Sequence, residues 1–136
     1  MPSKNLPIGY WIKRADVSLT KGINEIHSSF GLTRTGWQII NAIYEKEQMM
    51  SSEVESFVKP FADEQTISSI LSKFKEDDIL TEESEQLSLT EKGIQLHAVC
   101  FEKQKQFRQK MMKNISEQEY QQTISTLLKI IENLSS

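Results

Sequence analysis

The stretch from Asp63 to Gly93 constrains the fold most, because it reads as a helix, a tight hairpin and a second helix start. Asp63 is a good N-cap, since its carboxylate can accept from the free N–H groups of a first helical turn. Apolar residues then recur at spacings of three and four, which predicts one buried helix face made of Ile67, Ile70, Leu71 and Phe74. Asp77-Asp78 is expected to end this helix, because Asp tolerates the left-handed conformation.

The residues that follow predict two short strands, at 79–81 and 86–89, with a turn formed by 82–85. Thr90 is positioned to cap the next helix. A helix, a hairpin and a capped helix in this order are typical of a winged helix-turn-helix.

The rest of the chain is patterned as amphipathic helices. A long one is predicted from Ile8 to Phe30, and a second begins at a Thr33 cap. A polar loop is expected at 45–50, followed by a short helix that starts with a capping box of Ser52 and Glu55. Two more helices are expected, one from Thr90 to Met112 and one from Ser116 onward. The fold class is therefore mainly α with a small β-hairpin.

Three motifs carry a resemblance to a known family. The run 89–93, Leu-Thr-Glu-Lys-Gly, is similar to the signature after the wing of MarR-family regulators, and Thr66–Phe74 resembles their recognition helix. Residues 31–37 are similar to their Gly-Leu-Thr-x-x-Gln-Trp motif, with Gly36 in place of Gln. The similarity extends over roughly residues 6–134. It implies a homodimeric winged helix-turn-helix regulator that binds double-stranded DNA and is often relieved by a small-molecule effector.

The length favours one domain, residues 1–136. The resemblance places a winged-helix DNA-binding lobe at about 33–90 and dimerisation helices at 7–30 and 91–136. The long first and last helices carry more apolar surface than so thin a lobe can cover, and such surplus marks an interface. Pairing of these helices across a two-fold axis is the simplest way to cover that surface, and it agrees with the family's dimer.

The distribution of charge opposes DNA binding. The chain has a net charge of −3, but residues 51–90 alone carry three lysines against ten carboxylates, a net charge of −7. Apolar runs are far shorter than the ~20 residues of a membrane span, so no membrane partner is expected. A single cysteine forms no internal disulfide, which favours the cytoplasm.

The polar face of the 64–76 helix carries the candidate DNA-binding residues Gln65, Thr66, Ser68, Ser69, Ser72 and Lys73. Gln65 suits adenine, the serines suit base edges or phosphate, and Lys73 suits phosphate or guanine. Phosphate contacts are expected from Lys59, Lys73 and Lys75. The family's wing carries an Asp-x-Arg motif, whereas the 79–89 hairpin has no basic residue and is shorter. The alternative interpretation is that this face is an ordinary solvated helix surface.

Two functions therefore remain open. The first is a MarR-type regulator that binds a pseudo-palindromic operator as a homodimer. The second is a MarR-like protein-interaction module that has lost autonomous DNA binding, which the acidic hairpin favours.

Candidate effector-binding residues are Trp11, Trp37, Tyr44 and His97, although aromatic residues at helical spacing are more often core. Cys100 lies between apolar neighbours, which favours an inert thiol. The two histidines and one cysteine offer no ligand pair at metal-binding spacing, so no metal or cofactor is predicted. No catalytic motif supports an enzyme.

Overall fold

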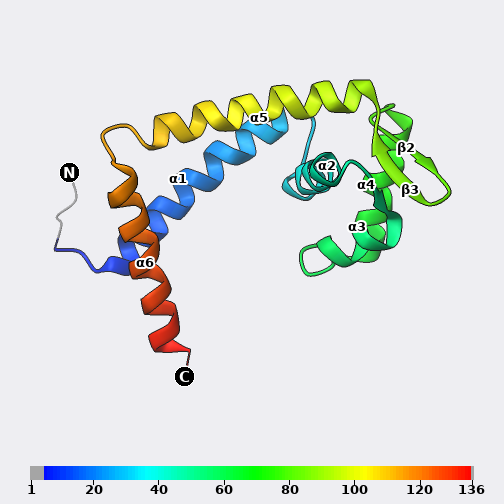
Figure 1. The fold of residues 1–136 in the computed structure, drawn as a ribbon. Helices are drawn as coiled ribbons and strands as arrows, with labels where there is room; N and C mark the ends of the chain where they lie inside the picture. The colour runs from blue at the N-terminus through cyan, green and yellow to red at the C-terminus, as the bar shows by residue number, and fades with distance from the viewer. Residues whose placement is uncertain (1–4, 136) are drawn as a thin grey trace. The chain divides into compact units, whose positions relative to one another are not determined.

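A computed structural model describes residues 5–135 and confirms a mainly helical winged helix-turn-helix. These residues form six helices and a three-stranded antiparallel sheet (Figure 1). In chain order the elements are α1 (Ile8–Ser29), α2 (Arg34–Lys46), β1 (Met49–Met50), α3 (Ser51–Val58), α4 (Glu64–Glu76), β2 (Leu80–Glu83), β3 (Gln86–Leu89), α5 (Glu91–Met111) and α6 (Glu117–Leu134).

The chain divides into two compact units, with the boundary between Gln104 and Lys105, inside α5. The first unit contains α1, the helix-turn-helix, the sheet and most of α5. The second contains the end of α5 and α6. α6 begins with the expected capping box, in which the Ser116 hydroxyl accepts from the Glu119 N–H at 3.0 Å and the Ser116 N–H donates to the Glu119 carboxylate at 3.0 Å.

Three other predicted helix caps are present. The Asp63 carboxylate accepts from the Thr66 N–H at 2.7 Å, and the Thr33 hydroxyl accepts from the Gly36 N–H at 3.0 Å. Thr90 caps α5 in the same way, through the Gly93 N–H at 3.0 Å. These caps satisfy N–H groups that have no partner inside their own helix, and they fix where α2, α4 and α5 begin.

Two expectations about residues 45–55 were wrong. The predicted loop contains β1, whose residues pair with β3 through Met49–Leu87 and Met50–Gln86. The helix that follows is not capped by Ser52 and Glu55. It starts two residues earlier, with Met50 as the N-cap, and the Glu53 carboxylate reaches back to the Met50 N–H at 2.9 Å. Strand pairing fixes the backbone up to Met50, so the first free helical N–H groups come earlier than the Ser-x-x-Glu pattern suggests.

The hairpin also has a tighter turn than predicted. Strand β2 continues to Glu83, which pairs with Gln86, so only Ser84 and Glu85 form the turn. Both have positive φ, 51° and 69°, as a two-residue type I′ turn requires. The sheet order is β1-β3-β2, which leaves β2 as an edge strand.

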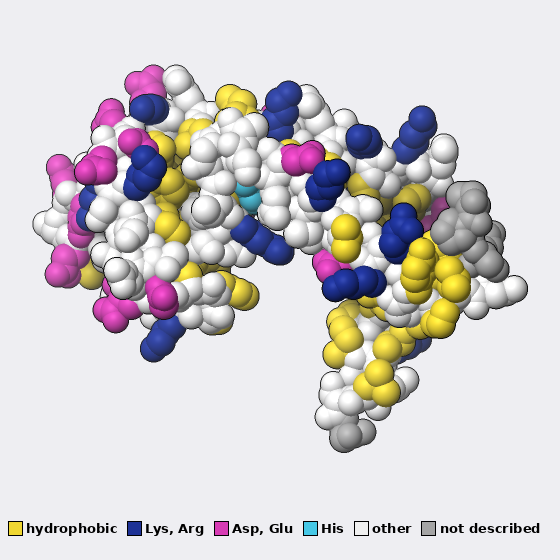
Figure 2. Space-filling view, turned by 180° about the vertical axis from the view of Figure 1, so that it is seen from behind, with side chains coloured by type: hydrophobic (Ala, Val, Ile, Leu, Met, Phe, Trp, Pro, Cys, Tyr) yellow, Lys and Arg dark blue, Asp and Glu magenta, His cyan; other side chains and the backbone are white. Residues whose placement is uncertain are grey.

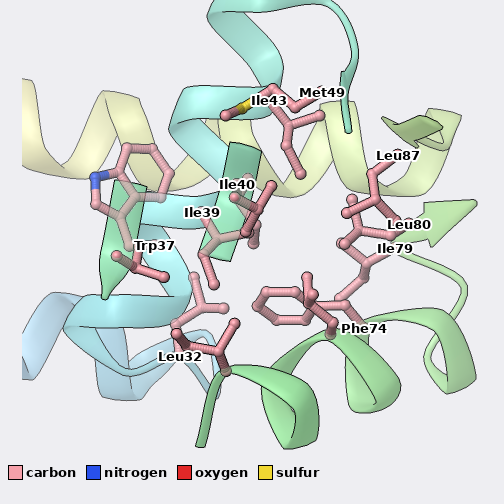
Figure 3. Packing of buried hydrophobic residues seen from close by; sticks show 14 of the residues in the cluster. Leu32, Trp37, Ile39, Ile40, Ile43, Met49, Phe74, Ile79, Leu80 and Leu87 are labelled. Atoms are coloured by element: carbon pink, nitrogen blue, oxygen red, sulfur yellow. The ribbon is translucent and has the colours of Figure 1, made fainter. Parts of the chain in front are cut away.

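The core lies between α2, α3, α4 and the sheet. Ile39, Ile40 and Ile43 of α2 are fully buried, as is Leu87 at the centre of the sheet. Figure 3 shows how side chains of α2, α4 and the residues around the hairpin converge, with Phe74 among them. Each such side chain contributes roughly 1.5–3 kcal/mol on burial, so this cluster holds the helix-turn-helix in place.

The Leu-Thr-Glu-Lys-Gly run joins the end of α4 to the start of α5. The Thr90 hydroxyl donates to the Asp78 carbonyl at 2.6 Å, and the Lys92 ammonium donates to the Asp77 carbonyl at 2.8 Å. Asp78 itself has φ 61°, the left-handed conformation expected there. A Cβ on Gly93 would overlap the carbonyl oxygen of Ile79. The motif therefore closes the hairpin by hydrogen bonds and by a close backbone approach.

Candidate nucleic-acid interface

The polar face of α4 is available to a ligand. Its apolar face is held in the core by Ile67, Leu71 and Phe74. The opposite face is exposed and contains all six predicted DNA-binding residues: Gln65, Thr66, Ser68, Ser69, Ser72 and Lys73. Two of these six side chains have partners among the described residues: Lys73 forms an ion pair with Asp77, and Thr66 hydrogen-bonds to the Asp63 carboxylate. The side chains of Gln65, Ser68, Ser69 and Ser72 are exposed to solvent.

The lysines near this face are largely paired with neighbouring carboxylates. The Lys73 ammonium lies 3.2 Å from the Asp77 carboxylate, and Lys75 forms a short ion pair with Glu82. Lys59 takes part in no ion pair within the part of the chain that the structure describes. Two of the three lysines expected to contact phosphate thus already have an anionic partner.

The hairpin presents acidic side chains, as Figure 2 shows for the charge gathered on this part of the molecule. Glu83 and Glu85 are exposed without an ion pair to any described residue. Glu82 differs, because one carboxylate oxygen accepts from Lys75 and the other accepts from the Ser51 hydroxyl at 3.1 Å. Lys75 first and Ser51 second hold the pKa of Glu82 below its usual range. The sequence shows Glu82 only as one of the acidic residues of the hairpin, and no local pattern signals its partner Ser51, 31 residues away.

Three of the four predicted effector residues are brought together. The His97 ring lies between Tyr44 and Trp37, with centroid distances of 3.8 Å and 5.0 Å, and all three rings are nearly parallel. The His97 Nε2 atom lies 2.9 Å from the Asn41 side-chain oxygen. Trp11 is not part of this stack and instead meets the Tyr10 ring edge-on at 5.0 Å.

A second buried histidine extends the stack to α1. The His27 ring is stacked on Trp37 at 6.1 Å, and its Nε2 atom lies 2.9 Å from the Gln104 amide nitrogen. Its Nδ1 atom has no partner within the described chain. Sequence reasoning did not single out His27, whose only signal is its place on the apolar side of the first helix. Burial lowers the pKa of both His27 and His97, so both rings favour the neutral form.

Two cavities flank this stack. One, of about 650 Å³, lies between α2 and α3 and includes Trp37, Asn41 and Phe57 in its lining. Another, of about 400 Å³, includes Tyr44 and Ile94. Neither is lined by His97 or Trp11, so the four predicted effector residues do not share either of these cavities.

Solved structures of MarR-family regulators match nearly the whole chain. MepR from Staphylococcus aureus, a transcription regulator of the multidrug efflux pump MepA, covers 96% of this chain with a TM-score of 0.74 at 14% identity, and 100% of its own length is matched. The chain has the fold of the MarR family.

The same comparison finds DNA-bound relatives of this fold. The Mycobacterium tuberculosis MarR family protein Rv2887, in complex with DNA, has a TM-score of 0.71 at 16% identity, covering 97% of this chain and 100% of its own. Reduced MarR from Escherichia coli has a TM-score of 0.66 at 15% identity, with coverage of 98% and 96%. No family model matches the sequence, and no curated protein matches it. The likeness therefore lies in the fold.

One departure from the MarR-family motifs has a packing reason. At Gly36, where the family motif has Gln, a Cβ would lie 3.2 Å from the Phe74 ring and 3.3 Å from the Thr33 hydroxyl. The absence of a side chain lets Phe74 of α4 approach the first turn of α2.

The remaining features concern the cysteine, metal binding and membrane-spanning helices. Cys100 is fully buried, and burial raises the pKa of its thiol to about 11, so little thiolate forms near neutral pH. Residues 5–135 contain no group of three His, Cys, Asp or Glu residues that could hold a metal ion. Nor does any helix among them combine the length and apolar character needed to span a bilayer.

Proposed function

We propose that the chain is a MarR-type transcriptional regulator that acts in the cytoplasm and binds a pseudo-palindromic DNA operator as a homodimer. One observation carries the proposal: α4 is fixed in the core by its apolar face while its polar face stays exposed and almost free of internal partners. A helix held in this way can enter a major groove without unfolding or rearranging.

The residues of this face suit base edges. Gln65 can form the bidentate pair with adenine, and Ser68 and Ser69 can bond base edges or phosphate. Thr66, Ser72 and Lys73 lie on the same exposed side and suit the flanking backbone. Two copies related by a two-fold axis place their α4 helices about one DNA turn apart, hence a pseudo-palindrome.

The electrostatics make this a binder with weak sequence-independent affinity. With Lys75 held by Glu82, and Lys73 reaching phosphate only by leaving Asp77, few phosphates are neutralised, and each contributes only about −0.9 to the slope of log K against log salt. N–H groups at helix N-termini can add phosphate contacts that need no cation. Affinity should therefore depend only shallowly on salt, and base contacts should dominate specificity.

The homodimer is supported by uncovered apolar faces. α6 buries none of its residues, and α1 buries only His27. Each helix bears large exposed apolar side chains, which are Ile8, Ile12, Val17 and Leu19 on α1 and Ile124, Leu128, Ile131 and Leu134 on α6. Exposing so many apolar groups to water is energetically unfavourable, and pairing with the same faces of a second copy would bury them. We assign residues 7–30 and 91–136 to dimerisation and 33–90 to DNA binding, within one functional domain.

A small-molecule effector is the third part of the proposal. The 650 Å³ cavity between α2 and α3 falls in the range of ligand sites, and its lining mixes Trp37 and Phe57 with polar groups. A ligand there would contact α3. Because α3 packs against α4, the ligand would influence α4, the helix that is proposed to contact bases. His97 and Tyr44 would act by supporting Trp37, whereas Trp11 of α1 does not line this cavity.

The test is a salt titration of the protein with its own upstream DNA and with random duplexes. Gln65→Ala should weaken binding to the upstream site by about 1–3 kcal/mol through one base position. Gln118→Ala removes the same amide from an exposed position of α6 and should change nothing. Equal affinities of wild type and Gln65→Ala on every duplex would show that this face does not read DNA.

The alternative is a MarR-like protein-interaction module. It is favoured by the net charge of −7 over residues 51–90 and by the ion pairs that occupy Lys73 and Lys75. It predicts that no duplex is retarded even at low salt, where phosphate attraction is strongest. That single result separates the two functions.

A further inference from the structure

We propose that Glu82 lowers the sequence-independent affinity of the DNA interface, because it holds Lys75 away from DNA phosphates. The inference rests on the proposed DNA-binding function and assigns a role to a wing carboxylate that base recognition leaves unexplained.

Glu82 connects three elements of the helix-turn-helix region. It lies on β2, Lys75 lies in the last turn of α4, and Ser51 is the first residue of α3. One carboxylate oxygen accepts from the Lys75 ammonium, and the other accepts from the Ser51 hydroxyl at 3.1 Å. The Ser51 N–H also donates to the Glu85 carbonyl at 3.1 Å, so the hairpin is attached to the start of α3 both at β2 and at its turn.

This arrangement differs from the other ion pair on α4. Lys73 and Asp77 are neighbours on one helix surface, with side chains 69% and 44% exposed, and such pairs are weak and easily exchanged. The Lys75 and Glu82 side chains are 42% and 28% exposed, and the carboxylate is held by two donors from two elements. A DNA phosphate can displace Asp77 from Lys73 with little loss, but to reach Lys75 it must displace a carboxylate that is better held.

The consequence follows from how proteins bind DNA. Sequence-independent affinity comes from phosphates that cations neutralise, whereas discrimination comes from base-edge contacts. Withholding Lys75 weakens attraction to every duplex equally and leaves Gln65 and Ser69 free to read bases. Affinity for every duplex therefore falls, and base contacts supply a larger share of the binding free energy that remains.

The experiment compares three variants of the full-length protein on the upstream site and on a random duplex. Glu82→Asp keeps the charge but is one methylene too short for both donors, and Glu82→Gln removes the charge. Glu83→Gln is the matched control, because it removes the same charge from the adjacent residue, which has no ion pair with any described residue. Both Glu82 variants should steepen the salt slope by about 0.9 on both duplexes, and Glu83→Gln should not.

A second cycle tests whether Lys75 is the cation released. Lys75→Gln should leave the wild-type slope nearly unchanged and should abolish the steepening in Glu82→Asp. If Glu82→Gln steepens the slope but Glu82→Asp does not, net charge is responsible and the proposal is wrong. A loss of about 0.9 from Lys75→Gln in the wild type would also overturn it, because Lys75 would then already contact phosphate. If wild type and all variants fail to bind any duplex, the proposed function falls and this inference falls with it.

Discussion

At the scale of single residues, the segment after the hairpin is specified by backbone geometry as much as by side chains. Thr90 and Lys92 bind carbonyls at the end of α4, and Gly93 lies against the Ile79 carbonyl. The three residues act together, because each closes part of the same gap between α4 and α5.

We therefore expect Gly93→Ala to destabilise the protein. Its added methyl would overlap backbone, which cannot rotate away as a side chain can, and overpacking of this kind costs roughly 1–3 kcal/mol. Gly9→Ala is the control, since a Cβ at Gly9 meets nothing within 4 Å, and it should be neutral or slightly stabilising. Denaturant unfolding of both variants measures the difference, and equal midpoints would contradict the packing argument.

The two buried histidines give stability a pH dependence of definite sign. Burial first, and Arg34 second, lowers the pKa of His27; burial lowers that of His97, with Glu45 opposing. A lowered pKa in the folded state means that the unfolded chain binds protons more readily. Stability should therefore be fully present above about pH 6.5, the pKa of an unperturbed histidine, and should be lost as pH falls through the lower folded-state values.

Thermal unfolding between pH 7 and pH 5 measures this loss. His97→Phe keeps a flat ring between Tyr44 and Trp37 but cannot bind a proton, so its melting temperature should fall less over the same interval. Parallel pH profiles for the variant and the wild type would show that His97 protonation does not limit stability.

At the scale of elements, the turn between β2 and β3 contains residue types that adopt its backbone conformation at some cost. Ser84 and Glu85 both have positive φ, which Asn and Gly adopt at lower cost. Ser84→Asn with Glu85→Gly should stabilise the protein by about 1 kcal/mol, measured as a higher denaturant midpoint. Ser84→Val should destabilise it, because a branched side chain disfavours positive φ. A turn indifferent to both changes would mean that the hairpin is open before the rest of the lobe unfolds.

Local patterns predicted the elements that depend on local chemistry. The caps at Thr33, Asp63 and Ser116 and the apolar face of α4 follow from spacing alone, and each was confirmed. Features that depend on distant partners were not predictable in this way. Strand β1 exists because Met49 meets Leu87, and the two anchors of Glu82 come from Lys75 and Ser51.

The candidate site likewise has some features that follow from local sequence and others that depend on distant partners. The exposed face of α4 could be read from helical periodicity, because one apolar stripe determines the opposite polar one. The family resemblance suggested Trp11, Trp37, Tyr44 and His97 as effector residues. The structure stacks the last three and places Trp11 against Tyr10, and the effector role stays a prediction. Only the structure shows that Lys73 and Lys75 are paired with carboxylates, because a sequence gives the number of charges but not their partners.

At the scale of the whole molecule, we expect the uncovered faces of α1 and α6 to hold two copies together. Leu128→Glu with Ile131→Glu places charges on side chains that are 59% and 61% exposed here, and should yield a monomer in sedimentation experiments. A stable dimer must bury about 1,200–2,000 Å² in total, which a few such helices can supply.

The control for this prediction is Gln121→Glu, which adds a charge at an exposed polar position of the same helix and should leave the dimer intact. A wild type that sediments as a monomer at micromolar concentration would refute the dimer itself.

The acidic hairpin has one more consequence, for solubility. β2 is an edge strand, and its outer N–H and C=O groups are free to pair with a strand from another molecule. Glu82 and Glu83 lie on this strand, and Glu85 lies in the turn beside it, so any copy that approached edge to edge would bring like charges together. The same carboxylates that weaken attraction to phosphate therefore protect the sheet from aggregation, and a wing stripped of all three would be expected to self-associate.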